Sequence, residues 1–141
     1  MMASIHVDIV SAEGELFEGD AAMVFAPARE GEIGIAPRHA PLLTTLVPGE
    51  VRVQAADGEE RLFFVTGGIL EIQGHLVTIL AETAMRADEL DEAAALEAKQ
   101  HAEQILADRP EGIDLAQAQQ ELVEAAARYQ AAQKLKGRDL R

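Results

Sequence analysis

Residues 31–46 read Gly-Glu-Ile-Gly-Ile-Ala-Pro-Arg-His-Ala-Pro-Leu-Leu-Thr-Thr-Leu, two short apolar runs separated by residues that interrupt a helix. Pro37 and Pro41 fix the backbone φ angle and remove two hydrogen-bond donors, so the stretch does not fit a helix. It predicts a strand, a turn and a second strand. Arg38 and His39 then lie at an exposed bend, and a bend this constrained is typical of a contact surface.

The composition indicates a small acidic protein with enough apolar residues for a core. The chain has 141 residues, of which 48% are hydrophobic, and a formal net charge of -13. Nucleic acid and anionic lipid bind clustered lysine and arginine, so this charge argues against both as partners. The absence of cysteine excludes disulfides and thiolate zinc sites. Because no apolar run approaches the roughly 18 residues of a membrane span, we expect no direct membrane insertion.

From Ser4 to about Glu82, apolar residues recur at every second position, which is typical of half-buried strands. These alternating residues are Ile5, Val7 and Ile9; Val51, Val53 and Ala55; Leu62, Phe64 and Thr66; and Val77, Ile79 and Ala81. Glycine-rich turn signals separate the runs, so many short strands in a sandwich or a barrel are expected. Asp57-Gly58 between two such runs predicts a hairpin with a type I′ turn.

After Arg86 the composition becomes helical, because residues 87–141 hold 14 alanines and only two glycines. We therefore predict two domains, residues 1–86 and residues 87–141. Asp88 is the predicted N-cap of a first helix that runs to about Ala107.

A second helix is expected after a short loop. Asp114 with Gln117 three residues on predicts a capping box at its start. One helical stripe contains Leu115, Ala118, Leu122, Ala125, Ala126, Tyr129 and Ala132. Two helices joined by a short loop are expected to pack antiparallel.

The alanine-rich stripe predicts a weakly held hairpin. An alanine buries about one methyl, roughly 0.8 kcal/mol, whereas a buried leucine contributes about 1.5–3 kcal/mol. Our hypothesis is that the hairpin detaches from the strands and extends. Residues 87–124 carry a net charge of −9 and residues 125–141 a net charge of +4. This basic end would suit an acidic partner, although cations near a helix C-terminus also complement the helix dipole.

The residues that carry most enzyme chemistry are not arranged for it. The four histidines, His6, His39, His75 and His101, lack the spacing of a metal site. Gly67-Gly68 precedes neither Lys-Ser nor Lys-Thr, so it does not predict a phosphate loop. Serines occur only at positions 4 and 11, with no nucleophile elbow. We predict no catalytic residue, no metal and no cofactor.

Several separated motifs resemble, in order, the epsilon subunit of bacterial F-type ATP synthases. They are residues 7–13, residues 31–46 followed by Gly49, residues 64–71, residues 77–84 and residues 90–93. The resemblance implies an α+β fold, in which an N-terminal ten-stranded β-sandwich precedes a C-terminal antiparallel two-helix hairpin.

The same resemblance implies a non-catalytic subunit of the central stalk, or rotor, of a proton-translocating ATP synthase. The sandwich would contact the gamma subunit and the ring of c subunits, so that proton flow is coupled to ATP synthesis. The hairpin would be able to extend to the beta and alpha subunits and restrain ATP hydrolysis. The protein would lie peripherally on the cytoplasmic face of the bacterial inner membrane.

Two groups of residues take roles through this resemblance. The residues expected to face the rotor and the c-ring are Glu30, Glu32, Arg38 and His39. The residues expected to make the regulatory contacts of the second helix are Arg128, Lys134, Lys136 and Arg138.

Some bacterial members bind ATP through Ile/Leu-Asp-x-x-Arg-Ala at the first helix, helped by arginines of the second. The matching residues here are Leu90, Asp91, Ala95 and Arg128. Ala94 replaces the arginine of the motif, and Glu124 falls where another arginine is expected. Because cationic phosphate partners are lost and an acid is gained, we predict weak or no ATP binding.

Two other classes of protein remain open at this point. One is a free-standing sandwich that binds a small molecule and dimerises through its hairpin. The other is an enzyme that depends on His39.

Overall fold

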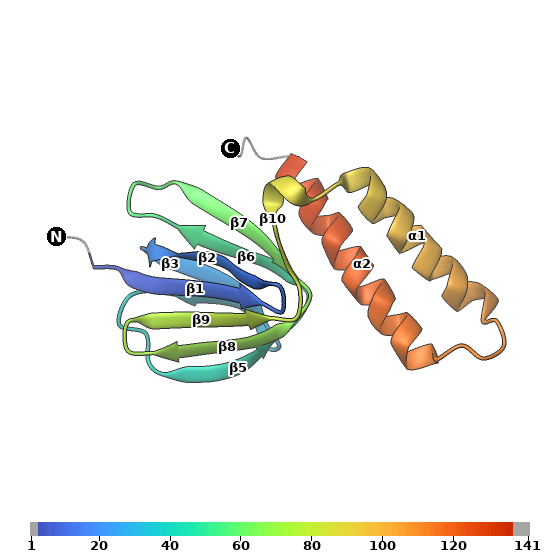
Figure 1. The fold of residues 1–141 in the computed structure, drawn as a ribbon, viewed down its shortest axis with the longest axis horizontal. Coiled ribbons are helices and arrows are strands. Elements are labelled where there is room, and N and C mark those ends of the chain that lie inside the picture. The colour runs from blue at the N-terminus through green and yellow to red at the C-terminus, as the bar shows by residue number, and fades with distance from the viewer. Residues whose placement is uncertain (1–2, 137–141) are drawn as a thin grey trace. The chain divides into compact units, whose positions relative to one another are not determined.

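The computed structural model describes residues 3–136, without the side chains of residues 135 and 136. The chain divides into two compact units, Met1–Ala87 and Asp88–Arg141. The first unit is made of strands and the second of helices (Figure 1). The strands are β1 (Ile5–Ser11), β2 (Gly14–Ala21), β3 (Met23–Ala28), β4 (Gly31–Ile35), β5 (Leu42–Leu46), β6 (Gly49–Gln54), β7 (Glu60–Val65), β8 (Gly68–Gln73), β9 (Leu76–Ala81) and β10 (Ala84–Arg86).

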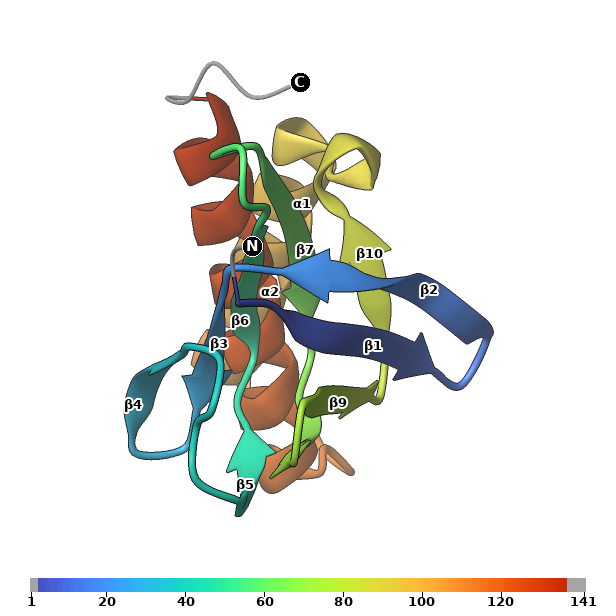
Figure 2. The same cartoon turned by 90° about the vertical axis from the view of Figure 1, so that its left-hand side faces the viewer.

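The ten strands form one hydrogen-bonded sheet that curls into a near-barrel sandwich (Figure 2). Its order is β10-β7-β6-β3-β5-β8-β9-β1-β2, and β4 pairs with β3 beside this path. The first and ninth strands run parallel, whereas the other paired strands are antiparallel. The predicted sandwich is confirmed.

The core contains residues of three of the four predicted alternating runs, together with residues outside those runs such as Val24, Ile35 and Leu70. Ile5, Val7 and Ile9 are all 0% exposed. The prediction is wrong for β7, where all four residues of Leu62–Val65 are buried. The core cluster includes Phe63 and Val65, so the strand is buried on both faces. A run of four apolar residues hides its own alternation, which is typical of strands buried in this way.

The hairpin between β6 and β7 is present, but its predicted type I′ turn is wrong. Gly58 has a φ of 89°, whereas Asp57 is not among the residues with positive φ. The Ala55 carbonyl accepts from the Gly58 N–H at 3.0 Å, and the Ala55 N–H donates to the Glu59 carbonyl at 2.8 Å. These bonds define a three-residue loop, in which a type I turn precedes a glycine bulge. The Asp57 carboxylate also accepts from the Glu59 N–H at 2.9 Å, which supports the longer loop.

The second unit begins with a short 3₁₀ turn, Ala87–Glu89, which precedes α1 (Glu92–Asp108) and α2 (Leu115–Lys136). The predicted N-cap of the first helix is wrong, because Asp88 lies in the 3₁₀ turn and Asp91 caps α1. The Asp91 carboxylate accepts from the Ala94 N–H at 3.2 Å. Three acids precede the helix, so side-chain chemistry alone did not identify which of them caps it.

The start of α2 agrees in part with the predicted capping box. Asp114 Oδ1 accepts from the Gln117 N–H at 3.2 Å, which confirms the N-cap. The Gln117 side chain instead bonds to Glu121 at 3.4 Å, so the reciprocal half of the box is wrong. The two helices pack against each other antiparallel, as predicted (Figure 1). Leu115 is 40% exposed and lies outside the packed stripe, whereas Ala118 is buried.

Candidate functional site

The bend between β4 and β5 has the exposed, constrained conformation that the sequence predicted. Arg38 has a φ of 70°, a left-handed conformation that is uncommon outside glycine, and its side chain is exposed. The His39 N–H donates to the Ala36 carbonyl at 3.2 Å. His39 Nδ1 lies 2.8 Å from the Ala40 carbonyl and donates to it, since a carbonyl only accepts. The bend therefore leaves Arg38 exposed and uses the half-buried His39 ring to hold its own backbone.

Two exposed acids lie at the other end of β4. Glu30 precedes the strand, and Glu32 lies within it with a side chain that is 56% exposed. Glu32 Oε1 lies 3.2 Å from Arg52 Nη2 on β6. Arg52 was not predicted from the sequence, although a lone cation between the buried Val51 and Val53 was a usable signal.

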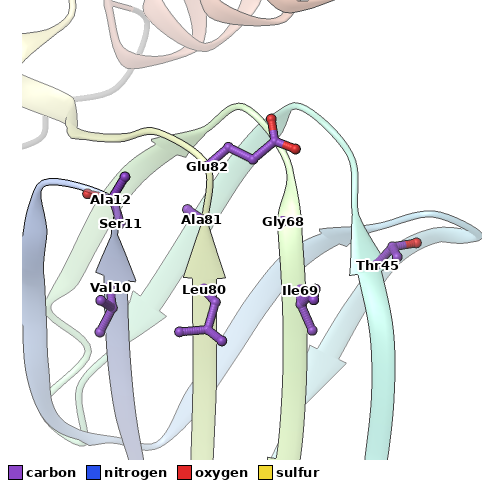
Figure 3. Close-up of a pocket in the computed structure, with 9 residues that line it drawn as sticks. All are labelled: Val10, Ser11, Ala12, Thr45, Gly68, Ile69, Leu80, Ala81 and Glu82. Carbon is purple, nitrogen blue, oxygen red and sulfur yellow. The ribbon is translucent and has the colours of Figure 1, made fainter.

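An apolar row, which was not predicted from the sequence, crosses the outward face of four strands. Thr45 pairs with Ile69, Ile69 with Leu80, and Leu80 with Val10 (Figure 3). These residues line a shallow depression of about 560 Å³. Leu80 is 50% exposed and Ile69 is 44% exposed, while Leu43 on the same face is 68% exposed. Exposed apolar side chains gathered in this way are typical of a surface that contacts another protein.

Acidic side chains border this apolar row on the first two strands. His6 Nδ1 lies 3.0 Å from Asp20 Oδ1, and His6 Nε2 lies 3.3 Å from Glu18 Oε2. Hydrogen bonds to Asp20 and then to Glu18 raise the pKa of His6 above its ordinary value of 6.5. A hydrogen bond to Asp8, followed by repulsion from Glu18, raises the pKa of Glu15.

Three of these acids, Asp8, Glu15 and Glu18, each place a ligand oxygen within 4.8 Å of the others. Among the residues described, this group is the one arranged closely enough to share a cation. Two of its three members are exposed, and exposed acidic groups are common without an ion. The arrangement therefore carries no metal assignment.

The residues that match the ATP motif already serve the structure of the hairpin. The Asp91 carboxylate is occupied by the cap of α1. Ala95 is 1% exposed, and Leu90 and Arg128 are half-buried. The motif therefore offers no exposed cation from the first helix to a phosphate.

The basic residues predicted for regulation lie along the second helix and beyond it. Arg128 lies in its middle, and Lys134 is exposed near its end. Lys136 is the last residue of α2, and its side chain is not described. Arg138 lies outside the described residues.

Both units match models of one protein family. The model for the ATP synthase Delta/Epsilon chain beta-sandwich domain matches residues 4–87, and the model for the long alpha-helix domain of the same chain matches residues 88–133. The chain belongs to the ATP synthase delta/epsilon family. The ATP synthase epsilon chain of Alkalilimnicola ehrlichii is 60% identical over 137 residues, which cover 97% of this chain and 98% of that one. The epsilon chain of Nitrosococcus oceani is 57% identical over 136 residues, which cover 96% and 97%.

A solved structure has the same fold. The Euglena gracilis mitochondrial ATP synthase, solved with OSCP, F1 and c-ring, holds a chain that matches with a TM-score of 0.80 at 19% identity. The match covers 96% of this chain and 82% of that chain.

Like other epsilon chains of the delta/epsilon family, the protein is a non-catalytic subunit of an ATP synthase, so the alternative of an enzyme built on His39 is wrong. Neither helix within residues 3–136 is long and apolar enough to cross a membrane.

Proposed function

We propose that the protein is the central-stalk epsilon chain of a proton-translocating F-type ATP synthase, where it couples proton flow to ATP synthesis. The observation that carries this proposal is the match of both units to the delta/epsilon chain, at up to 60% identity over 97% of the sequence. In this role the protein lies peripherally on the cytoplasmic face of the bacterial inner membrane. It acts by docking and transmits torque without catalysing a reaction.

The sandwich has two surfaces suited to such docking. The apolar row that includes Ile69 and Leu80 suits the gamma subunit, because burying it removes exposed apolar side chains from water. The segment with Glu30, Glu32, Arg38 and His39 suits the c-ring, because it presents charges of both signs on a strand and a bend held by backbone hydrogen bonds.

The hairpin supports the second part of the proposal, which is the restraint of ATP hydrolysis. Extension of the hairpin would bring Arg128, Lys134, Lys136 and Arg138 to acidic surfaces of the beta and alpha subunits. Reversing the charge of Lys134 with Lys134→Glu is expected to raise ATP hydrolysis by the reassembled complex. Arg61→Glu, an equal charge change on the sandwich, is the control. Equal hydrolysis rates for both variants would contradict the regulatory contact.

Nucleotide regulation is expected to be weak. Ala94 supplies no charge to a phosphate, and Glu124 accepts from the Gln120 amide at 3.2 Å where the family motif expects an arginine. Calorimetry of the full chain should therefore detect no micromolar affinity for ATP in the absence of magnesium. A micromolar dissociation constant would overturn this expectation.

Co-purification with gamma tests the central claim. Leu80→Glu would bury an uncompensated carboxylate at the gamma contact, so at least tenfold less gamma should be recovered. Val123→Glu is the matched control, because Val123 is 52% exposed but lies on α2. If Leu80→Glu recovers as much gamma as the wild type, the apolar row does not contact gamma. Failure of the unmodified protein to retain gamma would overturn the proposed function itself.

A further inference from the structure

Arg52 lies in a row that crosses three strands, with Phe25 at its centre. Phe25 on β3 pairs with Gly34 on β4 and with Arg52 on β6. The Arg52 guanidinium carbon lies 4.2 Å from the centre of the Phe25 ring. A guanidinium over an aromatic face is held by a cation–π interaction and by stacking of the two planar groups.

Arg52 is fixed by contacts that do not involve Glu32. Its Nε lies 3.7 Å from Glu50 Oε1, and its Nη1 lies 3.9 Å from Glu60 Oε2. The Glu50 and Glu60 side chains are only 12% and 20% exposed, and that of Arg52 is 22% exposed. The phenyl ring and two shielded carboxylates thus hold the guanidinium in place independently of Glu32.

The remaining edge of the guanidinium reaches outward to Glu32. Arg52 Nη2 lies 3.2 Å from Glu32 Oε1, and the Glu32 side chain is 56% exposed. A well-anchored cation therefore contacts one oxygen of an acid that stays accessible. Such a contact restricts the side-chain rotamers of Glu32 while leaving a face of its carboxylate open to solvent.

We propose that Arg52 is a positioning residue, which holds the Glu32 carboxylate ready for a cationic group of the c-ring. This inference rests on the proposed function, in which Glu32 faces the ring. Pre-ordering a side chain removes part of the entropy that binding otherwise costs. The ordering cost of one long side chain corresponds to an affinity change of about two- to tenfold.

The planar fork of arginine is essential to this role. It presents its N–H donors in fixed directions, so it contacts Glu32, Glu50 and Glu60 while stacked on Phe25. Lysine keeps the charge but concentrates it on one flexible ammonium group. Arg52→Lys therefore separates positioning from net charge.

The test measures binding of the full chain to ATP synthase that has been stripped of its own epsilon subunit. Arg52→Lys is expected to weaken binding about two- to tenfold. In a Glu32→Gln background the same substitution should change binding by less than twofold, because the group that it positions has lost its charge. Arg61→Lys is the matched control, since Arg61 is also a strand arginine over an aromatic ring, 5.6 Å from the centre of Phe17. It should leave binding unchanged in both backgrounds.

The comparison of backgrounds distinguishes positioning from general support of the fold. An equal loss with and without the Glu32 charge would assign Arg52 a merely structural role and overturn the inference. Unchanged binding by Arg52→Lys alone would also overturn it. If Glu32→Gln itself binds like the wild type, the ring contact of Glu32 in the proposed function is wrong, and the positioning role is wrong with it.

Discussion

Replacing Gly68 with alanine is expected to disrupt the pairing of β8 with β9. Gly68 has a φ of +141°, which side chains of L-residues rarely adopt. An added Cβ would overlap the Leu80 carbonyl oxygen and lie 2.9 Å from the Ala81 Cα. Both of these atoms belong to the backbone, so rotation of a side chain cannot relieve the overlap.

The size of the effect follows from two costs. A strained backbone conformation costs about 1–3 kcal/mol, and overpacking costs about 1–3 kcal/mol more. Gly68→Ala should therefore lower the free energy of unfolding by about 2–6 kcal/mol. Gly14 provides a matched control, because its φ is +128° but no atom lies within 4 Å of its added Cβ. Gly14→Ala should show the strain alone, about 1–3 kcal/mol.

Native-state hydrogen exchange of the amides in β8 and β9 measures this difference without a contribution from the helices. Gly68→Ala should also weaken gamma recovery, because the displaced strands carry Ile69 and Leu80 of the apolar row. Equal destabilisation by the two glycine variants would refute the steric reasoning. Wild-type protection in Gly68→Ala would refute the whole account of this position.

Three further outcomes are expected. The raised pKa of His6 means that its stabilising contacts are present below pH 6.5 and are lost as the pH rises through its folded-state pKa. The NMR titration midpoint of His6 should therefore lie above 6.5, and it should fall in the Asp20→Asn variant. An unchanged midpoint in this variant would contradict the contact with Asp20. Asp91→Ala should destabilise α1 by about 1 kcal/mol, as seen in faster amide exchange, whereas Asp88→Ala should cost less than half as much, and equal effects would contradict the assigned cap. Amides of residues 88–136 should exchange through local openings that cost less free energy than global unfolding. Protection equal to that of the strands would contradict the hypothesis of a weakly held hairpin.

The inward face was predictable in strands such as β1, where one face alone is apolar. Ile5, Val7 and Ile9 alternate with polar neighbours, so their inward direction follows from the period of a strand. The same rule fails over Leu62–Val65, because both faces are apolar and the pattern has no phase. The prediction of the turn type at Gly58 failed for a different reason. The length of this loop depends on hydrogen bonds between its two ends, which the local sequence does not specify.

The candidate contacts were predictable only as local motifs. Glu32 could be identified from the stretch that contains it, but its partner Arg52 lies 20 residues away. Their contact depends on β3 pairing with both β4 and β6, which is a property of the tertiary structure. The apolar row likewise needs the registers of four strands, including the parallel pairing of Leu80 with Val10.

The two units differ in how much each buried side chain stabilises them, and this difference bears on the proposed restraint of ATP hydrolysis. The sandwich buries complete branched side chains such as Ile9 and Ile79, at about 1.5–3 kcal/mol each. The buried residues of α1 are alanines, Ala95 and Ala102, at roughly 0.8 kcal/mol per methyl. Lys99 lies 5.3 Å from the centre of the Tyr129 ring and adds about 0.5–1 kcal/mol between the helices. Because the N-caps of both helices are local, each helix can keep its cap when the pair separates. The proposed contact with the beta and alpha subunits would therefore be made by α2 as a helix.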